Sequence, residues 1–283
     1  VPSEASTSER LLLETISLIT SALLSTVFFC VHAKSSGSIA AAMITRDIFF
    51  VMDVCFNPNV FLNEYDAEIS QALDIIAHEG HDCVLLAGHS TGGLTTTLYV
   101  AHHPEHPLIK ALWLNSPFYD FNMPTWKKKL ALPKLSVLGK YCPNLKFPSE
   151  LNKFYVQSLH SAFHGEWNFN LNWKKKSYPL VHLSFVHAIF EAQKELQQAV
   201  RISVPTLVMH SHQTTSPKKW NKDAQTSDII LDIKDIERCA NKLPGDVNVM
   251  TIKDGLHDLV LSAPTVRQHV YTQLFTWLKQ KNL

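Results

Sequence analysis

The run Gly88-His89-Ser90-Thr91-Gly92-Gly93 constrains the fold more than any other part of the chain. It contains a G-x-S-x-G pattern, with the apolar run 83–87 before it and residues 94–102, which have a helical pattern, after it. In such an elbow the serine lies on a tight strand-to-helix turn, and the flanking glycines let neighbouring backbone pass without side-chain clashes. The context therefore predicts strand, turn and helix in register, with Ser90 as a candidate nucleophile.

Short apolar runs and helical periodicities alternate along the rest of the chain. Leu62, Tyr65, Ile69, Leu73 and Ile76 recur at helical spacing and stop before Gly80, which predicts a helix with a glycine C-cap. A last helix is expected over 264–279, and strands are expected at 26–31, 48–52, 83–87, 111–114, 204–210 and 247–252. Strands that alternate with helices indicate an α/β fold with a mostly parallel sheet covered on both faces.

The alternation breaks between about residues 119 and 200. This stretch is rich in aromatic side chains and carries the basic runs 127–129 and 174–176. An insertion of this length between two sheet strands is usually functional. We expect residues 119–200 to form a cap, and residues 1–118 and 201–283 to form one catalytic domain.

Net charge and cysteine content limit which partners and which cellular compartment are expected. The 26 basic and 25 acidic residues leave a net charge of +1, which gives no electrostatic reason to expect nucleic acid or an anionic membrane as partner. The five cysteines are widely spaced, which predicts neither a disulfide framework nor a zinc site. Residues 11–31 are apolar, but Glu14 and many Ser and Thr residues favour buried strands over a membrane span. A cytoplasmic protein is therefore expected.

A nucleophilic serine needs a base to take its proton and a carboxylate to orient that base. In this architecture the chain order is serine, acid, histidine. His257 follows the last predicted strand, in a loop that can project a side chain over the strand ends, so we expect it to be the base. The acid should precede it, and spacing alone does not choose among Asp223, Asp228, Asp232, Asp235, Glu237, Asp246 and Asp254.

At this point the sequence resembles the α/β-hydrolases of the monoacylglycerol lipase, lysophospholipase and "serine aminopeptidase" group. The resemblance runs from about residue 62 to the C-terminus and is carried by five separated segments, namely GHSTGG at 88–93, LNSP at 114–117, HGEW at 164–167, SDIILD at 227–232 and GLHDLV at 255–260. It implies an α/β-hydrolase fold with a helical cap. It also implies Ser90 as nucleophile, His257 as base and Asp228 as acid, because the acid of this group opens a D-x-x-x-D run.

The N-terminal part departs from the group's pattern. Relatives have His-Gly after the strand that corresponds to 26–31, and the next residue donates a backbone N–H to the oxyanion. Here the matching positions read His32-Ala33-Lys34, so residues 1–60 are expected to be diverged. The oxyanion donors would then be the N–H groups of Thr91 and Lys34, and losing one such donor costs about 10²- to 10³-fold in rate.

The favoured function is hydrolysis of carboxylic esters with an apolar acyl group, such as monoacylglycerols or lysophospholipids, without cofactor or metal. His89, Phe118 and Trp167 are expected to contact the substrate. One alternative is an aminopeptidase or amidase, which would need cap carboxylates for a free amine, and Glu150, Glu166, Glu191 and Glu195 are available. The other alternative is a silent hydrolase homologue that acts as a binding protein.

Overall fold

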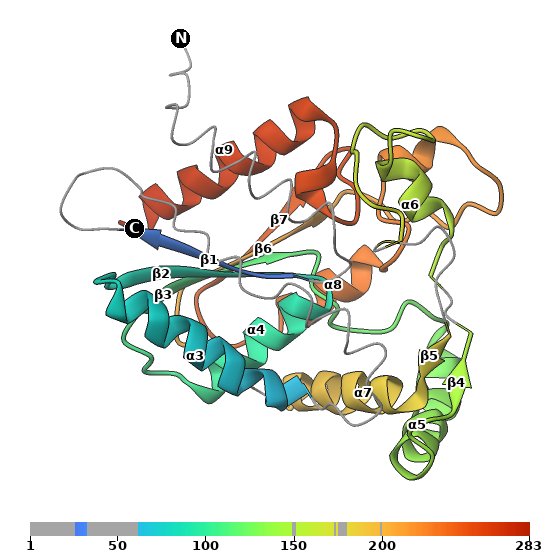
Figure 1. The fold of residues 1–283 in the computed structure, drawn as a ribbon, viewed down its shortest axis with the longest axis horizontal. Helices are drawn as coiled ribbons and strands as arrows, with labels where there is room; N and C mark the ends of the chain where they lie inside the picture. Colours follow the sequence, from blue (N-terminus) through green and yellow to red (C-terminus); the bar gives the residue numbers. More distant parts are fainter. Residues whose placement is uncertain (1–25, 33–61, 149–150, 173, 175–179, 199) are drawn as a thin grey trace.

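The computed structural model describes residues 26–32, 62–148, 151–172, 174, 180–198 and 200–283 (Figure 1). The sheet has the strand order β1-β2-β3-β6-β7. β1 is antiparallel to β2, and the other neighbouring strands are parallel. Among the described residues, its strands are β1 (Thr26–His32), β2 (Cys83–His89), β3 (Ile109–Asn115), β6 (Thr206–Ser211) and β7 (Val247–Ile252). The mostly parallel α/β sheet predicted from the sequence is therefore confirmed.

Helices lie against both faces of this sheet. Figure 1 shows α9 (Pro264–Gln280) on one face and α3 (Tyr65–His78) and α4 (Thr91–His102) on the opposite face. α3 follows a 3-10 turn at Leu62–Glu64, and α8 (Ile233–Ala240) packs against β6 and β7. The core between the layers consists of aliphatic and aromatic side chains that exclude water, and its aliphatic members include Leu73, Ile76, Leu86, Leu112, Leu207 and Val208.

The predicted helix that ends before Gly80 has the expected buried face. Tyr65, Ile69, Leu73 and Ile76 of α3 are all buried. Gly80 has a φ of +87°, and its N–H donates to the Ala77 carbonyl, as expected for a glycine that ends a helix. The strand predicted at 48–52 lies outside the described residues.

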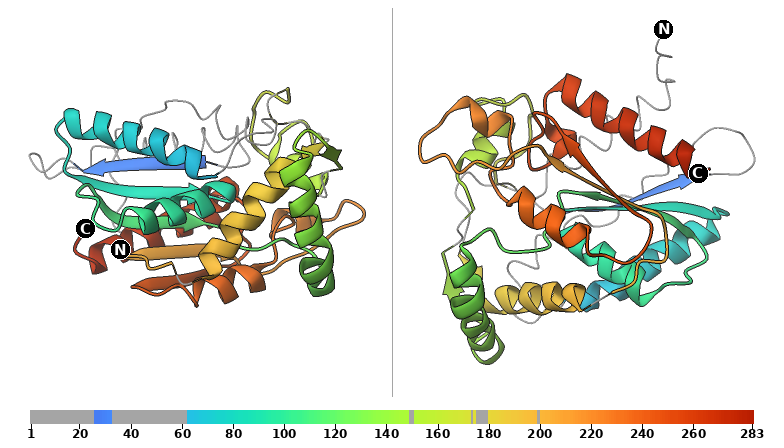
Figure 2. Two further views of the ribbon diagram at one scale, coloured as in Figure 1. Left: turned by 90° about the horizontal axis from the view of Figure 1, so that it is seen from below. Right: turned by 180° about the vertical axis from the view of Figure 1, so that it is seen from behind.

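Between β3 and β6, the described residues form five elements of their own. They are α5 (Thr125–Tyr141), β4 (Lys146–Phe147), α6 (Phe154–Leu159), β5 (Val181–His182) and α7 (Leu183–Gln197), and β4 pairs with β5. α5 packs against α7 at one end of the molecule (Figure 2). A Cβ atom on Gly139 of α5 would collide with the Leu183 carbonyl, so glycine is what permits this close approach.

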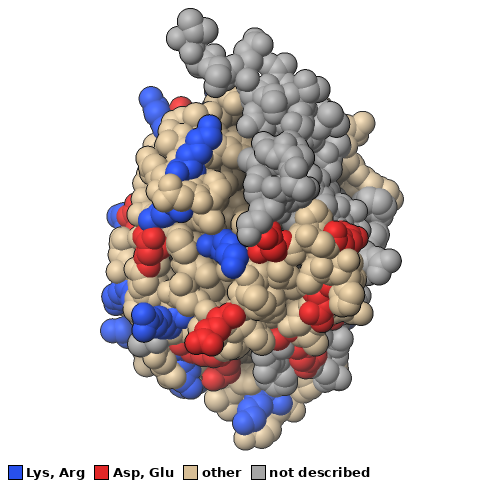
Figure 3. All heavy atoms as spheres, turned by 90° about the vertical axis from the view of Figure 1, so that its left-hand side faces the viewer, with Lys and Arg blue, Asp and Glu red and all other residues tan. Residues whose placement is uncertain are grey.

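Charged side chains of both signs lie on the face shown in Figure 3. On the face shown in Figure 3, basic and acidic side chains lie close to one another, as the near-neutral net charge leads one to expect. Within the described part of the chain, no helix is long and apolar enough to cross a membrane.

Candidate functional site

Ser90 occupies the sharp turn between β2 and α4. Its φ of 54° and ψ of −119° place it in a region that non-glycine residues rarely adopt. The flanking glycines make this turn possible, because a Cβ on Gly88 would clash with Thr96 and with the Gly92 carbonyl. A Cβ on Gly93 would lie 2.8 Å from the Cβ of Pro117. The strand, turn and helix around Ser90 thus have the arrangement that the sequence predicts.

His257 lies in the loop that follows β7, with an exposed fraction of 1%. Its Nε2 is 3.1 Å from the Oγ of Ser90, although 167 residues separate them in sequence. The turn before it includes Asp254 at a φ of 57°. This turn redirects the chain, so that the imidazole reaches the carboxyl ends of the parallel strands.

Asp228 completes a relay with His257 and Ser90. Its Oδ2 accepts a hydrogen bond from His257 Nδ1–H at 2.8 Å, and its side chain is fully buried. Its Oδ1 accepts the N–H groups of Ile230 and Leu231, each at 2.8 Å. With Nδ1 donating to the carboxylate, Nε2 is left as the acceptor for the Ser90 hydroxyl.

Asp232, the other candidate acid in the D-x-x-x-D run, has a different structural role. Asp232 is the N-cap of α8, and its carboxylate accepts the N–H of Lys234 at 3.0 Å. Such a cap satisfies a helix-end donor that would otherwise have no partner. The two aspartates are therefore separated by their contacts, which spacing alone could not do.

A second buried hydrogen-bond network, missed by the sequence reasoning, joins the Ser90 turn to the His257 loop. Asn115 ends β3, and its Nδ2 donates to Asp258 Oδ1 at 2.7 Å. Its Oδ1 accepts the Leu259 N–H at 3.2 Å. Its backbone carbonyl accepts the N–H of Ser90 at 3.1 Å. Asn115 therefore connects the Ser90 turn to the His257 loop. The only sequence signals were the LNSP and GLHDLV segments, which do not indicate a contact.

His89 belongs to the same network and is fully buried. Its Nδ1–H donates to the Asn115 carbonyl at 2.9 Å, and its ring centroid is 4.7 Å from that of His257. Burial lowers the pKa of His89 to about 4, against the opposing effect of Asp258, so the imidazole is neutral near pH 7. Its Nε2 lies 3.8 Å from Asp258 Oδ2, and neither atom has a hydrogen-bond partner among the described residues.

The segment between β3 and β6 brings two more buried side chains to the site. The Tyr155 ring lies edge-on to His257, with 5.7 Å between centroids. The Nζ of Lys174 lies 5.1 Å from the Tyr155 ring centroid and 5.8 Å from that of Phe169. Burial lowers the pKa of Lys174 to about 8, while the charge of Asp258 opposes this shift. In the sequence, only the aromatic content of this segment and its basic run 174–176 pointed to such side chains.

Of the two side chains predicted to contact a substrate, Phe118 is bonded to the Ser90 backbone, and Trp167 is bonded to the turn that follows His257. The N–H of Phe118 donates to the Ser90 carbonyl at 2.9 Å, and its half-buried ring lies against Phe121. Trp167 Nε1–H donates to the Leu261 carbonyl at 2.9 Å, and the Arg267 guanidinium lies 4.7 Å from its ring centroid. Trp167 thus links the inserted segment to the turn that follows His257.

Of the two predicted oxyanion donors, only Thr91 lies among the described residues. Thr91 is the first residue of α4, where a backbone N–H has no carbonyl of its own helix to bind. The positive end of the helix dipole also lies there. Lys34 lies outside the described residues.

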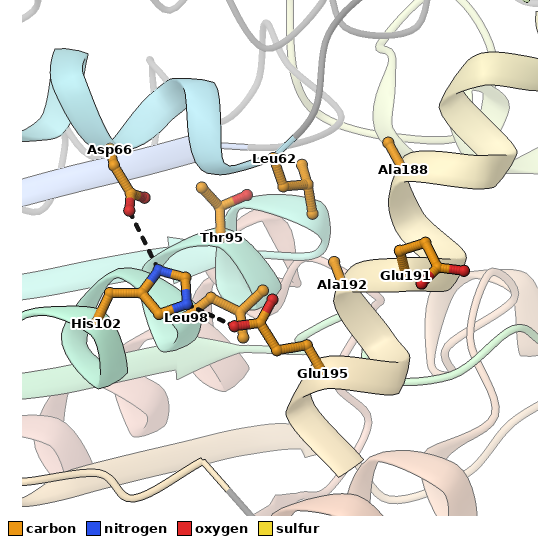
Figure 4. A pocket seen from close by; sticks show the side chains of 9 residues that line it. All are labelled: Leu62, Asp66, Thr95, Leu98, His102, Ala188, Glu191, Ala192 and Glu195. Atoms are coloured by element: carbon orange, nitrogen blue, oxygen red, sulfur yellow. Dashed lines mark hydrogen bonds and ion pairs between the residues drawn. The ribbon is translucent and has the colours of Figure 1, made fainter. Parts of the chain in front are cut away.

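A separate cavity of about 350 Å³ lies between α3, α4 and α7 (Figure 4). His102 borders it and bridges Asp66 of α3, at 3.2 Å, and Glu195 of α7, at 2.6 Å. None of its lining residues belongs to the Ser90 relay. No group of three or more His, Cys, Asp or Glu side chains that could hold a metal occurs in the part of the chain that the structure describes.

Solved structures with a similar fold include two lipases. The monoacylglycerol lipase of Paleococcus ferrophilus matches with a TM-score of 0.54 and 20% identity, over 77% of this chain and 75% of that one. A soluble variant of the monoglyceride lipase of Saccharomyces cerevisiae, in complex with a substrate analogue, matches with a TM-score of 0.52 and 17% identity, over 77% and 68%. Similarity at this identity establishes the α/β-hydrolase fold.

The sequence comparisons place the chain within that fold. No curated protein matches it. The family model described as serine aminopeptidase, S33, matches residues 62–215, which is more than half of the chain and includes the Ser90 turn. The chain therefore belongs to the serine aminopeptidase S33 family of α/β-hydrolases.

Proposed function

We propose that this α/β-hydrolase is a serine hydrolase that cleaves carboxylic esters through an acyl-enzyme intermediate. The observation that carries the proposal is the relay of two hydrogen bonds, 3.1 Å from Ser90 Oγ to His257 Nε2 and 2.8 Å from His257 Nδ1 to Asp228 Oδ2. Its base and acid are almost completely buried. A nucleophile, a base and an orienting carboxylate at these distances are what nucleophilic catalysis by serine requires.

In the proposed reaction, Ser90 Oγ attacks the ester carbonyl while His257 Nε2 takes the hydroxyl proton. Asp228 stabilises the imidazolium that forms. Two backbone N–H groups donate to this carboxylate and fix it in place. The tetrahedral intermediate collapses as His257 gives its proton to the leaving alcohol. Water, activated by the same base, then releases the acid and restores Ser90.

The oxyanion of the tetrahedral intermediate needs donors placed before the reaction starts. We assign the first to the N–H of Thr91, which has the helix dipole behind it. The second assignment, the N–H of Lys34, follows from the resemblance alone.

We assign positioning roles to Asn115, Asp258 and His89. Asn115 bonds to the backbone at Ser90 and to the side chain that follows His257, so it sets the distance between nucleophile and base. His89 was expected to contact the substrate. Its full burial and its bond to the Asn115 carbonyl favour a role behind the Ser90 turn instead.

The proposed substrate is an ester with an apolar acyl group, of the monoacylglycerol or lysophospholipid type, and residues 119–200 are its proposed cap. Phe118 and Trp167, both partly buried, and the Tyr155 ring would supply apolar contact area near Ser90. The lipase names of the two structural neighbours agree with this substrate class.

The family's description favours a second candidate, an aminopeptidase. That activity needs a carboxylate free to bind a substrate amine. Glu166 is paired with Arg267, Glu191 with Lys194, and Glu195 with His102. Glu150 lies outside the described residues. These pairings make the ester the better-supported substrate.

The test compares the wild type with Ser90→Ala, and uses Ser216→Ala, an exposed serine, as the matched control. The proposal expects fluorophosphonate labelling and hydrolysis of p-nitrophenyl esters in the wild type and the control. Both should be lost in Ser90→Ala, by on the order of 10⁶-fold in kcat. Ester turnover independent of Ser90 contradicts the mechanism. Turnover of aminoacyl arylamides with inert esters contradicts the substrate class, and a fully inert wild type favours the silent homologue.

A further inference from the structure

The buried lysine, arginine, aspartate and glutamate side chains of the described part of the chain all lie at the candidate site. They are Lys174, Asp228 and Asp258, with exposed fractions of 2%, 0% and 0%. Lysine is among the side chains least often buried, and a buried charge is unfavourable unless other charges or hydrogen bonds compensate it. Lys174 comes from the segment between β3 and β6, so this segment brings a cation to two buried carboxylates.

The two carboxylates differ in how well hydrogen bonds compensate them. Asp228 accepts hydrogen bonds from the His257 ring and from two backbone N–H groups. Asp258 accepts one from Asn115 on Oδ1, and its Oδ2 has no hydrogen-bond partner among the described residues. The imidazole of His89, 3.8 Å from that oxygen, is neutral because burial lowers its pKa to about 4. A cation is therefore needed more at Asp258 than at Asp228.

The ammonium of Lys174 is held in a defined position. Its Nζ lies over two ring faces, 5.1 Å from the centroid of Tyr155 and 5.8 Å from that of Phe169, and such contacts strengthen away from water. The loop that carries it is fixed to the end of α6, because His160 Nε2–H donates to the Phe169 carbonyl at 3.0 Å. The edge of the Tyr155 ring lies against His257. One aromatic side chain therefore contacts both the ammonium and the proposed base.

We propose that Lys174 is a positioning residue that balances the charge of Asp258 and thereby keeps His257 available as a neutral base. This inference rests on the proposed function. A carboxylate without a counter-charge beside the base favours the imidazolium, which cannot accept the Ser90 proton. The ammonium cancels that effect and also disfavours the imidazolium directly, so both effects have the same sign.

The groups that titrate near this pair come from several elements. Those that surround Lys174 and His257 are His89 at the end of β2, Tyr155 of α6, His160 after α6, Asp228 before α8 and Asp258 after β7. Burial lowers the pKa of Lys174 to about 8 against the effect of Asp258, so the lysine stays protonated in acidic and neutral solution. His89 gains its proton only near pH 4. An acid limb of the pH profile above pH 5 therefore reports the base with Lys174 charged.

The test measures kcat/KM for a p-nitrophenyl ester against pH in variants with opposite expected signs. Lys174→Met keeps the apolar stem, and the acid limb should move up by about one pH unit, the low end for a nearby charge because the Tyr155 ring lies between. Asp258→Asn leaves the ammonium without its counter-charge and should move the limb down. Lys174→Met/Asp258→Asn removes both charges and should return the limb close to its wild-type position.

Lys153→Met is the matched control. Lys153 belongs to the same inserted segment and its Nζ lies 5.2 Å from the Phe154 ring centroid, but its side chain is exposed, so the limb should not move. A merely structural role of Lys174 would lower kcat in the single and the double variant without moving the limb. The inference is overturned if a Ser90-dependent wild-type limb stays in place in Lys174→Met, or if the double variant keeps the shift. If Lys174→Met does not fold, a limb in Asp258→Asn that fails to move down overturns it.

A measurement without turnover separates this inference from the proposed function. If the wild type does not cleave esters, the proposed function fails, and the His257 ring signals are then followed by NMR against pH in Ser90→Ala and in Ser90→Ala/Lys174→Met. A transition at higher pH in the double variant supports the charge balance. Transitions at the same pH overturn it.

Discussion

Asn115 offers the sharpest test of how the proposed site is assembled. Its amide donates to Asp258 and accepts from Leu259, while its carbonyl binds the Ser90 N–H. The change Asn115→Asp keeps the size of the side chain and an acceptor for Leu259. It removes the donor to Asp258 and places two carboxylates at a contact of 2.7 Å in a buried position.

The expected magnitude follows from these contacts. A hydrogen bond to a charged group contributes about 1.5–3 kcal/mol, and a buried like-charge contact adds to its loss. We therefore expect Asn115→Asp to lower the free energy of unfolding by about 3 kcal/mol near neutral pH. A displacement of about 1 Å between nucleophile and base costs about 10²-fold in rate, so kcat for esters should fall by about that factor while KM changes little.

A double variant that exchanges the hydrogen-bond donor and acceptor between positions 115 and 258 serves as the matched control. In Asn115→Asp/Asp258→Asn the new amide at position 258 can donate to the new carboxylate at 115. We expect the double variant to recover part of both stability and kcat, with a coupling energy above about 1 kcal/mol in a double-mutant cycle. The measurements are urea unfolding and p-nitrophenyl ester kinetics. A wild-type kcat in Asn115→Asp, or no coupling in the cycle, would refute the positioning role.

Three further predictions test other contacts. Gly88→Ala should cost about 2 kcal/mol or more, because its Cβ meets Thr96 and backbone, and an unchanged Tm would contradict this. Burial opposes protonation of His102, but its two carboxylate partners outweigh it and raise its pKa above 6.5. The stability from this bridge should be fully present below pH 6.5 and be lost as the pH rises through the higher folded-state pKa, so His102→Gln should flatten Tm against pH. Trp167→Phe removes the bond to the Leu261 carbonyl and should lower the free energy of unfolding by about 1 kcal/mol, measured by urea unfolding, and no change would show that the bond is dispensable.

Local patterns were sufficient for most of the architecture. The helix periodicity from Leu62 to Ile76 and the short apolar runs depend on burial of one face or of a whole strand, which residue order alone expresses. The Ser90 turn was equally predictable, since Gly88 is required by its contacts with Gly92 and Thr96, which lie close by in the chain. Pattern did not reveal that β1 runs antiparallel to β2, because the direction of a strand depends on how the chain returns.

The contacts within the candidate site depend on segments that are distant in the sequence. Asp228 and Asp232 are equivalent by spacing, and only the fold makes one the partner of His257 and the other a helix cap. The bond between Asn115 and Asp258 spans 143 residues, so no local pattern could encode it.

By itself, then, the sequence determined the α/β architecture, the position of the Ser90 turn and His257 as the candidate base. Each depends on neighbours along the chain or on the order of elements. The choice of Asp228 as the acid came from the resemblance and not from spacing, and the tertiary structure shows its contact with His257. Only the tertiary structure decided what joins the Ser90 turn to the His257 loop and which side of α5 faces solvent. The physical reason is that burial and hydrogen bonding act between residues that are close in space, and chain folding alone brings these residues together.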